Sequence, residues 1–214
     1  MNDIDAATRA WLQSTIGPDF EIEKHAYSHQ DDVYKIQTPA ERYYLKIAPS
    51  LRTERDNLLR LRPHATVPDV LGFTRINGRD HLLMSELHGR NLAELAGELG
   101  NEMIVKEFAR AIKMFHALDA HILFPARAKP GLVVLHGDMA MPNVLRGADG
   151  ELGFIDLAQM SVGLMDVDLA DAIWSLQRNI GPGYGELLLR EYGGVAITPK
   201  LEAALQFKHV PAKP

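Results

Sequence analysis

The sequence changes character near residue 88, and this change limits the folds that the chain can adopt. Before it, short runs rich in β-branched and aromatic residues, such as Val33–Ile36 and Tyr43–Ile47, predict strands. Asn77-Gly78 separates two further runs and is a strong hairpin signal. After it, apolar residues recur mainly at helical spacing. We therefore predict an α+β fold with a β-rich lobe over residues 1–87, a mainly helical lobe over 88–214, and a cleft between them.

One helical pattern, Leu51–Leu61, interrupts the β region, and Ser50 stands where it can cap that helix. A short helix is predicted around Ile4–Leu12, and Asn101 can cap a helix in the second half. Later elements are predicted as strands at Leu132–Leu135, Val144-Leu145 and Leu152–Ile155, and as helices at Met165–Gln177 and Tyr184–Tyr192.

Composition excludes several classes of protein. The 214 residues contain no Cys, so disulfides, thiolate metal sites and cysteine nucleophiles are ruled out. A net charge of −5 shows no basic surface, so we expect no nucleic-acid partner. No apolar run approaches the roughly 20 residues of a membrane helix, and the first residues lack the pattern of a signal peptide. We expect a cytoplasmic protein that does not bind membranes.

The segment His136–Leu145 and the segment Gly153–Asp156 place three polar side chains at the ends of short apolar strands. These side chains are Asp138, Asn143 and Asp156. Phosphoryl transfer from a nucleotide needs such a set, because one carboxylate orients the acceptor hydroxyl while an amide and a second carboxylate hold Mg²⁺ on the phosphates. The sequence therefore predicts phosphotransferase chemistry.

Lys46 and Glu54 extend this pattern toward the N-terminus. Strand alternation puts Lys46 on the face opposite Leu45 and Ile47, so it can be a nucleotide-phosphate ligand or simply a solvated lysine. Glu54 lies three residues after Leu51 and four before Leu58, which places it on the inward face of its helix. A buried Glu needs a partner, so we predict a Lys46–Glu54 pair.

Two other interpretations of His136–Asn143 stay open at this stage. The segment could begin a metal-hydrolase site, although the other histidines show no paired spacing of the H-x-x-x-H kind. Alternatively, Asp138 and Asn143 could only cap turns. The ordered Lys and Asp partners on either side favour phosphoryl transfer over both.

The spacing His-x-Asp-x-x-x-x-Asn is that of a kinase catalytic loop, and His136–Leu145 resembles the loop of the aminoglycoside phosphotransferase family. Three further segments are similar to that family in the expected order, namely Leu82–Gly89 at the hinge, Met114–Asp119, and Phe154–Asp156 with Asp168-Leu169-Ala170. The resemblance implies a protein-kinase-like two-lobed α+β fold. It also implies transfer of the γ-phosphoryl of ATP or GTP to a hydroxyl of a small molecule, such as an aminoglycoside antibiotic.

The resemblance implies a role for each matching residue. Asp138 would be the catalytic base, Asn143 and Asp156 the Mg²⁺ ligands, and Lys46, held by Glu54, a phosphate ligand. Backbone atoms of the three hinge residues Ser85, Glu86 and Leu87 would bind the adenine. His136 and Asp168 would brace the loop by hydrogen bonds.

Two segments depart from the family pattern. The expected phosphate loop, residues 26–34, contains no Gly, and Ser28 is its candidate hydrogen-bond donor to a nucleotide phosphate. The negative charges of Asp31 and Asp32 would repel the phosphates unless both side chains turn outward. This departure supports an alternative function as a catalytically weak, nucleotide-binding pseudokinase that acts through partners. Only 16 residues separate Asp119 from His136, so we expect a reduced helical insert, and the C-terminal residues are basic instead of acidic.

Overall fold

A computed structural model describes residues 4–25 and 31–206, which group into two compact units. The first unit runs to Pro63 and resumes at Val67–Leu87, and the second contains His64–Thr66 and everything from His88 onward. Residues 64–66, which lie within the predicted first lobe, group with the second unit. None of the described helices is both long enough and apolar enough to cross a membrane.

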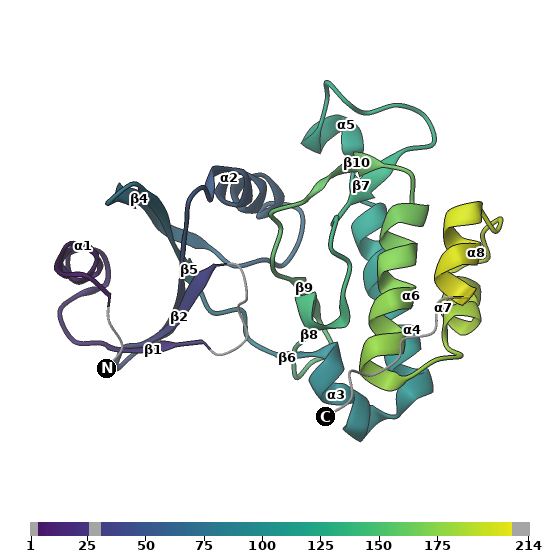
Figure 1. Cartoon of the computed structure of the whole chain (residues 1–214), viewed down its shortest axis with the longest axis horizontal. Helices are drawn as coiled ribbons and strands as arrows, with labels where there is room; N and C mark the ends of the chain where they lie inside the picture. Colours follow the sequence, from purple (N-terminus) through teal and green to yellow (C-terminus); the bar gives the residue numbers. More distant parts are fainter. Residues whose placement is uncertain (1–3, 26–30, 207–214) are drawn as a thin grey trace. The chain divides into compact units, whose positions relative to one another are not determined.

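The first unit is an antiparallel sheet of five strands with a helix on each face (Figure 1). In spatial order its strands are β1 (Glu21–Lys24), β2 (Asp32–Gln37), β3 (Arg42–Ala48), β5 (Arg79–Ser85) and β4 (Val70–Ile76). Helix α1 (Ala6–Ile16) packs Leu12 against Ile36, Leu45 and Leu83 on one face. Helix α2 (Arg52–Leu61) lies on the other face, so strand alternation leaves Lys46 of β3 on the α2 side.

The predicted cap of α2, Ser50, is wrong. The helix begins after Leu51, and no side chain next to it in sequence caps it. Instead, the Leu51 amide donates to the carboxylate of Asp80 at 3.0 Å, and Asp80 is fully buried in β5. Ser50 makes no cap hydrogen bond because a carboxylate 29 positions away in sequence already accepts from the helix start. Such a partner has no local sequence signal.

The second unit joins helices to two small sheets (Figure 1). The helices are α3 (Leu92–Leu99), α4 (Asn101–His116), α5 (Ala120–Leu123), α6 (Asp166–Ile180), α7 (Gly185–Tyr192) and α8 (Pro199–Gln206). One sheet contains β6 (Arg90–Asn91), β8 (Val144–Arg146) and β9 (Leu152–Phe154), and the other pairs β7 (Val133–Leu135) with β10 (Ser161–Gly163). A short 3-10 turn, η1 (Met141–Asn143), precedes β8. The one helix between Asp119 and His136 is the four-residue α5.

A second predicted cap is also wrong. Asn101 is the first residue of α4 rather than its cap, and Gly100 takes the cap position with φ of 80°. The side-chain amide nitrogen of Asn101 instead donates to the Tyr184 hydroxyl at 2.9 Å, which connects α4 to the residue that precedes α7. Asn91 does cap a helix, because its side chain accepts from the Glu94 amide at the start of α3.

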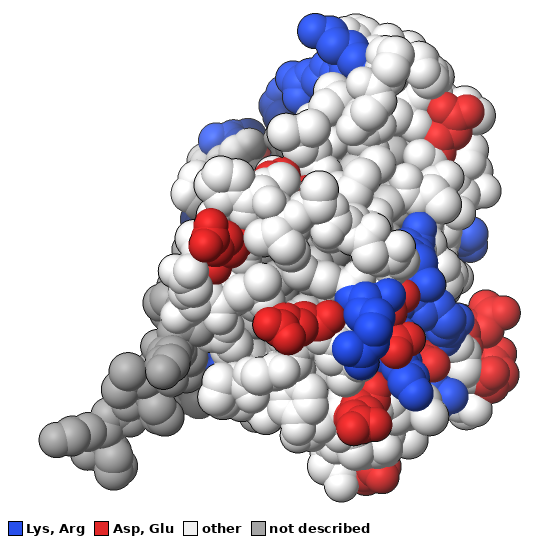
Figure 2. Space-filling model, turned by 90° about the vertical axis from the view of Figure 1, so that its right-hand side faces the viewer, with Lys and Arg blue, Asp and Glu red and all other residues white. Residues whose placement is uncertain are grey.

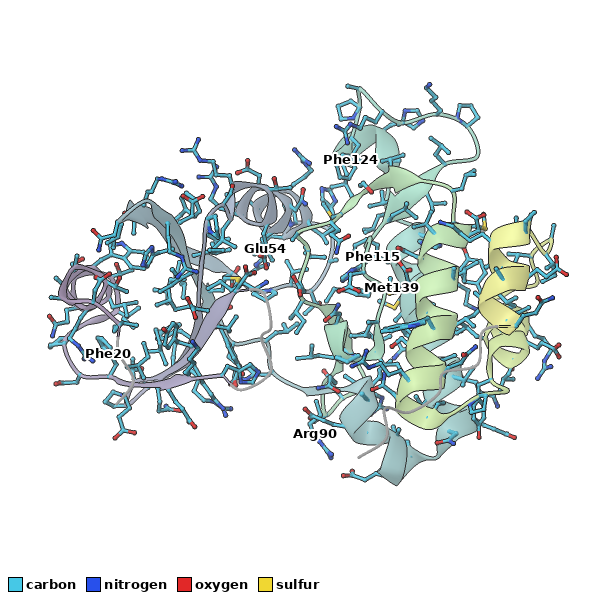
Figure 3. All side chains as sticks on the ribbon, viewed as in Figure 1. Phe20, Glu54, Arg90, Phe115, Phe124 and Met139 are labelled. Carbon is cyan, nitrogen blue, oxygen red and sulfur yellow. The ribbon has the colours of Figure 1, made fainter. Side chains whose placement is uncertain are left out.

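The core of the second unit lies beneath the segment that carries Asp138. Phe115 and Phe154 are buried with ring centroids 4.9 Å apart, and Met139 of the same unit is also fully buried (Figure 3). Trp174 of α6 is 41% exposed and stacks with Arg178. The face shown in Figure 2 interleaves acidic and basic side chains instead of forming a continuous basic surface.

Candidate active site

Helix α6 holds the segment 136–143, here called the catalytic loop, at two points. At the first turn of α6, Asp168 is fully buried and accepts from the backbone amides of His136 at 2.8 Å and Gly137 at 2.9 Å. Two helical turns later, the Ser175 hydroxyl accepts from the Met141 amide at 2.8 Å. Residues 168 and 175 are seven positions apart and therefore share one face of the helix. The loop thus runs along α6 between two hydrogen-bonded anchors.

Gly137 is required by the bend at the beginning of the loop. Its φ of 83° lies in the left-handed region, where side chains are disfavoured. A Cβ at this position would lie 2.3 Å from the carbonyl oxygen of Gln159, closer than atoms can approach. The glycine therefore allows both the bend and the close contact with the chain that follows β9.

The His136 ring supports the loop from below. It packs against Phe115 with ring centroids 5.3 Å apart, and its Nε2 donates to the Ile155 carbonyl at 3.0 Å. Burial lowers the pKa of His136, so the ring stays neutral, with its proton on Nε2. Because the side chain is completely buried, it braces the loop and is not exposed to a substrate.

Asp138 and Asn143 are joined directly. The side-chain amide nitrogen of Asn143 donates at 3.0 Å to both the carbonyl and the carboxylate Oδ2 of Asp138. This contact fixes the orientation of both groups, since the Asn143 nitrogen points at Asp138 and its Oδ1 must point away. The arrangement leaves one oxygen of Asp138 and the oxygen of Asn143 as acceptors that no other described side chain or amide uses.

Asp156 follows β9 and is brought next to Asn143 by strand pairing. β8 and β9 are antiparallel with Val144 opposite Phe154, and the Ile155 amide donates to the Asn143 carbonyl at 3.0 Å. Asp156 is exposed, and its φ of 60° is a conformation that Asp tolerates better than most residues. One amide and one carboxylate oxygen suit Mg²⁺, which binds oxygen and usually takes only one or two protein ligands. The donor set therefore fits the predicted ion.

In the first unit, Lys46 and Glu54 form the expected ion pair. The Lys46 ammonium lies 2.8 Å and 3.1 Å from the two carboxylate oxygens of Glu54. The side chains are 13% and 3% exposed, and Glu54 projects from α2 (Figure 3). Asp56, which points away from the sheet, is exposed and paired with Arg55. A buried, two-pronged contact holds the ammonium in one place, which a solvated lysine would not require.

Sequence comparisons relate the chain to known phosphotransferases. The family model described as Phosphotransferase enzyme family matches residues 120–205. The chain is 28% identical to an aminoglycoside 3'-phosphotransferase of Niallia circulans over 89% of its own length and 93% of that protein. It is 35% identical to an Enterococcus faecalis protein of the same name, over 41% of this chain and 36% of that one.

Solved structures show the same fold. An aminoglycoside-3'-phosphotransferase of type VIII covers 96% of this chain and 97% of its own, with a TM-score of 0.74 and 20% identity. A Streptomyces rimosus aminoglycoside phosphotransferase, solved with ADP and streptomycin, has a TM-score of 0.72 at 20% identity, covering 95% of this chain and 97% of its own. The chain is similar to aminoglycoside phosphotransferases in sequence and in fold. It is a kinase that phosphorylates a hydroxyl, and the predicted kinase-like α+β fold is confirmed.

In the hinge of this phosphotransferase, two of the three backbone N–H groups predicted to bind adenine already have acceptors. The backbone N–H of Ser85 donates to the backbone carbonyl of Asp69 at 2.9 Å. The backbone N–H of Glu86 donates to the backbone carbonyl of Arg42 at 3.0 Å. These two N–H groups are used within the first unit. Of the three predicted hinge residues, Leu87 is the one whose backbone N–H meets no acceptor in residues 4–25 and 31–206. Adenine recognition by Ser85–Leu87 stays a prediction.

The predicted phosphate loop of the phosphotransferase is described only in part. Ser28 lies outside the described residues. Asp32 begins β2, where its carboxylate contacts Lys24 at 2.7 Å and Arg79 at 2.6 Å. Hydrogen bonds from Lys24 and Arg79 lower the pKa of Asp32. Lys24 and Arg79 therefore compensate the negative charge of Asp32, which the sequence analysis considered unfavourable near the phosphates.

Asp171 of α6 is a further carboxylate near the catalytic loop, and the sequence analysis did not identify it. It lies three positions after Asp168 and four before Ser175, so it sits on the helix face that the catalytic loop follows. Partial burial, with the negative charges of Asp168 and Asp138, raises the pKa of Asp171 to about 6. It makes no hydrogen bond or ion pair with another described residue. In the sequence, its spacing of three residues from Asp168 was the signal that could have placed Asp171 on this helix face.

Proposed function

We propose that this enzyme transfers the γ-phosphoryl group of ATP or GTP to a hydroxyl of an amine-bearing small molecule such as an aminoglycoside. The observation that carries the proposal is the Asp138–Asn143 contact at 3.0 Å within an anchored loop. A carboxylate held in this way has one oxygen fixed and one available. That geometry suits the base that orients an acceptor hydroxyl and takes its proton.

Asn143 and Asp156 would hold Mg²⁺ on the nucleotide phosphates. When bound, the ion supplies positive charge that stabilises the developing charge on the transferred group. The chain's own contribution is to orient the Asn143 oxygen away from Asp138, through the amide contact described above. The base and the metal ligand are thereby positioned by the same hydrogen bonds.

Lys46 would bind the phosphates from the first unit. Glu54 contacts its ammonium with both oxygens, so the cation is oriented before nucleotide binds. Pre-organised charge is more effective than charge that must reorient during the reaction. The Leu87 amide and the backbone carbonyls near it would bind the nucleotide base.

The names of the relatives and the position of Asp171 support an amine-bearing acceptor. The sequence relatives reported above are aminoglycoside 3'-phosphotransferases. Asp171 offers a carboxylate that makes no hydrogen bond or ion pair with another described residue, on the helix face beside the catalytic loop. An ammonium group on the acceptor would compensate this charge and hold a neighbouring hydroxyl near Asp138.

Replacing the proposed base tests the function directly. Asp138→Asn removes the proton acceptor while keeping the size of the side chain, so we expect turnover to fall by roughly 10²–10⁴-fold. The nucleotide Kd, measured by calorimetry with Mg²⁺, should change little. Asp149→Asn, in the exposed turn between β8 and β9, is the matched control and should keep full activity.

The assay should screen a panel of aminoglycosides, sugars and amino alcohols for phosphate incorporation from labelled ATP and GTP. Turnover that survives in Asp138→Asn would contradict the proposed base. Nucleotide binding without phosphate incorporation into any acceptor would favour the pseudokinase alternative.

A further inference from the structure

Behind the catalytic loop, a chain of buried and partly buried hydrogen bonds links the ends of three helices. The Tyr192 hydroxyl at the end of α7 lies 3.0 Å from Nδ1 of His116, the last residue of α4. Nε2 of His116 lies 3.1 Å from Oδ2 of Asp168 in the first turn of α6. Asp168 in turn accepts the His136 and Gly137 amides. A hydroxyl on the far helix is thus connected to the loop that carries Asp138.

The donors and acceptors in this chain follow from the chemistry of each group. A carboxylate only accepts, so Nε2 of His116 carries the proton that Asp168 receives. With a single proton on the ring, Nδ1 is an acceptor, and the Tyr192 hydroxyl donates to it. Burial raises the pKa of Tyr192, as does the negative charge of Asp168, so the hydroxyl keeps the proton that it donates.

The surroundings allow one ring orientation. Rotating the His116 ring by half a turn would place carbon atoms opposite both Tyr192 and Asp168, and would break both hydrogen bonds. His116 is only 8% exposed, so solvent does not replace them. The other acceptor near the Tyr192 hydroxyl is the Met165 sulfur at 3.8 Å, a weak acceptor.

We propose that Tyr192 is a positioning residue, whose hydroxyl holds His116 in the Nε2–H form and orientation that supports Asp168 beneath the catalytic loop. Without it, Nδ1 of His116 becomes a buried acceptor with no donor, which favours displacement of the ring. A displaced ring donates less well to Asp168, and Asp168 then holds the two loop amides less firmly. Tyr192 acts through this relay and does not itself touch a substrate. The link to turnover rests on the proposed role of Asp138.

The state of His116 can be measured without an activity assay. Long-range ¹⁵N–¹H correlation spectra of the labelled, unliganded wild-type protein, assigned with the spectrum of His116→Gln, should show Nε2 protonated and Nδ1 unprotonated. In Tyr192→Phe, which keeps the ring contact with His116, the Nδ1 resonance should move because its donor is gone. A wild-type proton on Nδ1, or an unchanged Nδ1 resonance in the variant, would overturn the assignment.

Kinetics then test the consequence for the loop. Tyr192→Phe should lower kcat by about three- to tenfold, the range expected for one lost hydrogen bond, with the KM for nucleotide within about twofold of wild type. Met165→Leu removes the competing sulfur and is the matched control, so it should leave kcat unchanged. An unchanged kcat in Tyr192→Phe would contradict the proposal.

A double-mutant cycle separates positioning through His116 from a general packing effect. His116→Gln keeps an N–H that can reach Asp168 but has no Nδ1, so adding Tyr192→Phe to it should cost almost nothing further. The same three- to tenfold loss in both backgrounds would show that Tyr192 acts independently of His116. If the wild type phosphorylated no acceptor, the proposed function would fail, whereas the spectra would still test the hydrogen-bond assignment.

Discussion

Three aspartates near the catalytic loop show how surroundings give one side chain different properties. Asp168 is fully buried and accepts two backbone amides and an imidazole N–H, so it serves to anchor the loop. Asp138 has one oxygen fixed by Asn143 and one available for chemistry. Asp171 has no described partner and has a raised pKa. Their roles follow from the donors that tertiary structure brings to each carboxylate.

The raised pKa of Asp171 predicts that its charge destabilises the folded protein. The pKa rises from 3.8 to about 6 on folding, so the folded state binds the proton more tightly, and stability is lost as pH rises through about 4 to 6. Asp171→Asn removes this cost. Allowing for solvent screening, we expect the variant to be about 1–2 kcal/mol more stable at pH 7.5, and to gain about half as much at pH 5.

Urea unfolding of wild type and variant at the two pH values measures this difference. Asp19→Asn, at an exposed position between α1 and β1, should change stability by less than about 0.5 kcal/mol at either pH. A gain for Asp171→Asn that is equal at pH 5 and pH 7.5 would contradict the assigned cause. If Asp171 binds an acceptor amine, the more stable variant should also show a higher KM for that acceptor.

At the level of elements, the catalytic loop is positioned by its attachment to α6. Its start is held by Asp168 and its end by Ser175, and the bend between β7 and the loop needs Gly137. A loop with fixed ends can keep Asp138 and Asn143 within hydrogen-bond distance before any ligand binds. Disturbing either end should therefore affect turnover more than nucleotide affinity.

Two glycines with almost equal φ angles test the close contact at Gly137. Gly131 has φ of 81° and open space around its Cβ position, whereas a Cβ at Gly137 would lie 2.3 Å from the Gln159 carbonyl. Gly131→Ala should cost only the backbone strain, about 1 kcal/mol. Gly137→Ala adds a backbone clash, so we expect a loss of at least about 3 kcal/mol, or a displaced loop with greatly reduced kcat.

Thermal unfolding and kcat of both variants measure this effect. Equal destabilisation of the two variants, with activity kept in both, would show that the chain around Gln159 can move aside and that Gly137 is needed only for its backbone angle.

At the level of the whole molecule, the predicted ligand residues are divided between the two units. Lys46, Glu54 and the hinge amide belong to the first unit, and Asp138, Asn143 and Asp156 belong to the second. Binding of nucleotide and metal to the folded protein would add to its stability. This linkage is measurable as a shift in unfolding.

Magnesium dependence provides the corresponding prediction. At a Mg·ATP concentration 100 times its Kd, the folded protein should gain about 2.7 kcal/mol, seen as a rise in the unfolding midpoint. Excess EDTA should remove most of this gain, and Asn143→Ala should make the shift insensitive to magnesium. A shift that is the same with and without magnesium in the wild type would contradict the roles of Asn143 and Asp156. Substituting GTP for ATP in the same measurement identifies the preferred donor.

The sequence by itself determined the change from β-rich to mainly helical structure near residue 88, the hairpin at Asn77-Gly78 and the spacing His-x-Asp-x-x-x-x-Asn, because these depend on residues close together in the chain. It also predicted the Lys46–Glu54 pair, since strand alternation and helical periodicity place both side chains inward. Only the tertiary structure decided which partners complete them. Asp80 caps α2 in place of Ser50, Asn101 contacts Tyr184, and Tyr192 reaches His116 from 76 residues away. Hydrogen bonds between residues far apart in the sequence form wherever packing brings a donor and an acceptor together. Short sequence patterns do not indicate which distant residues will meet.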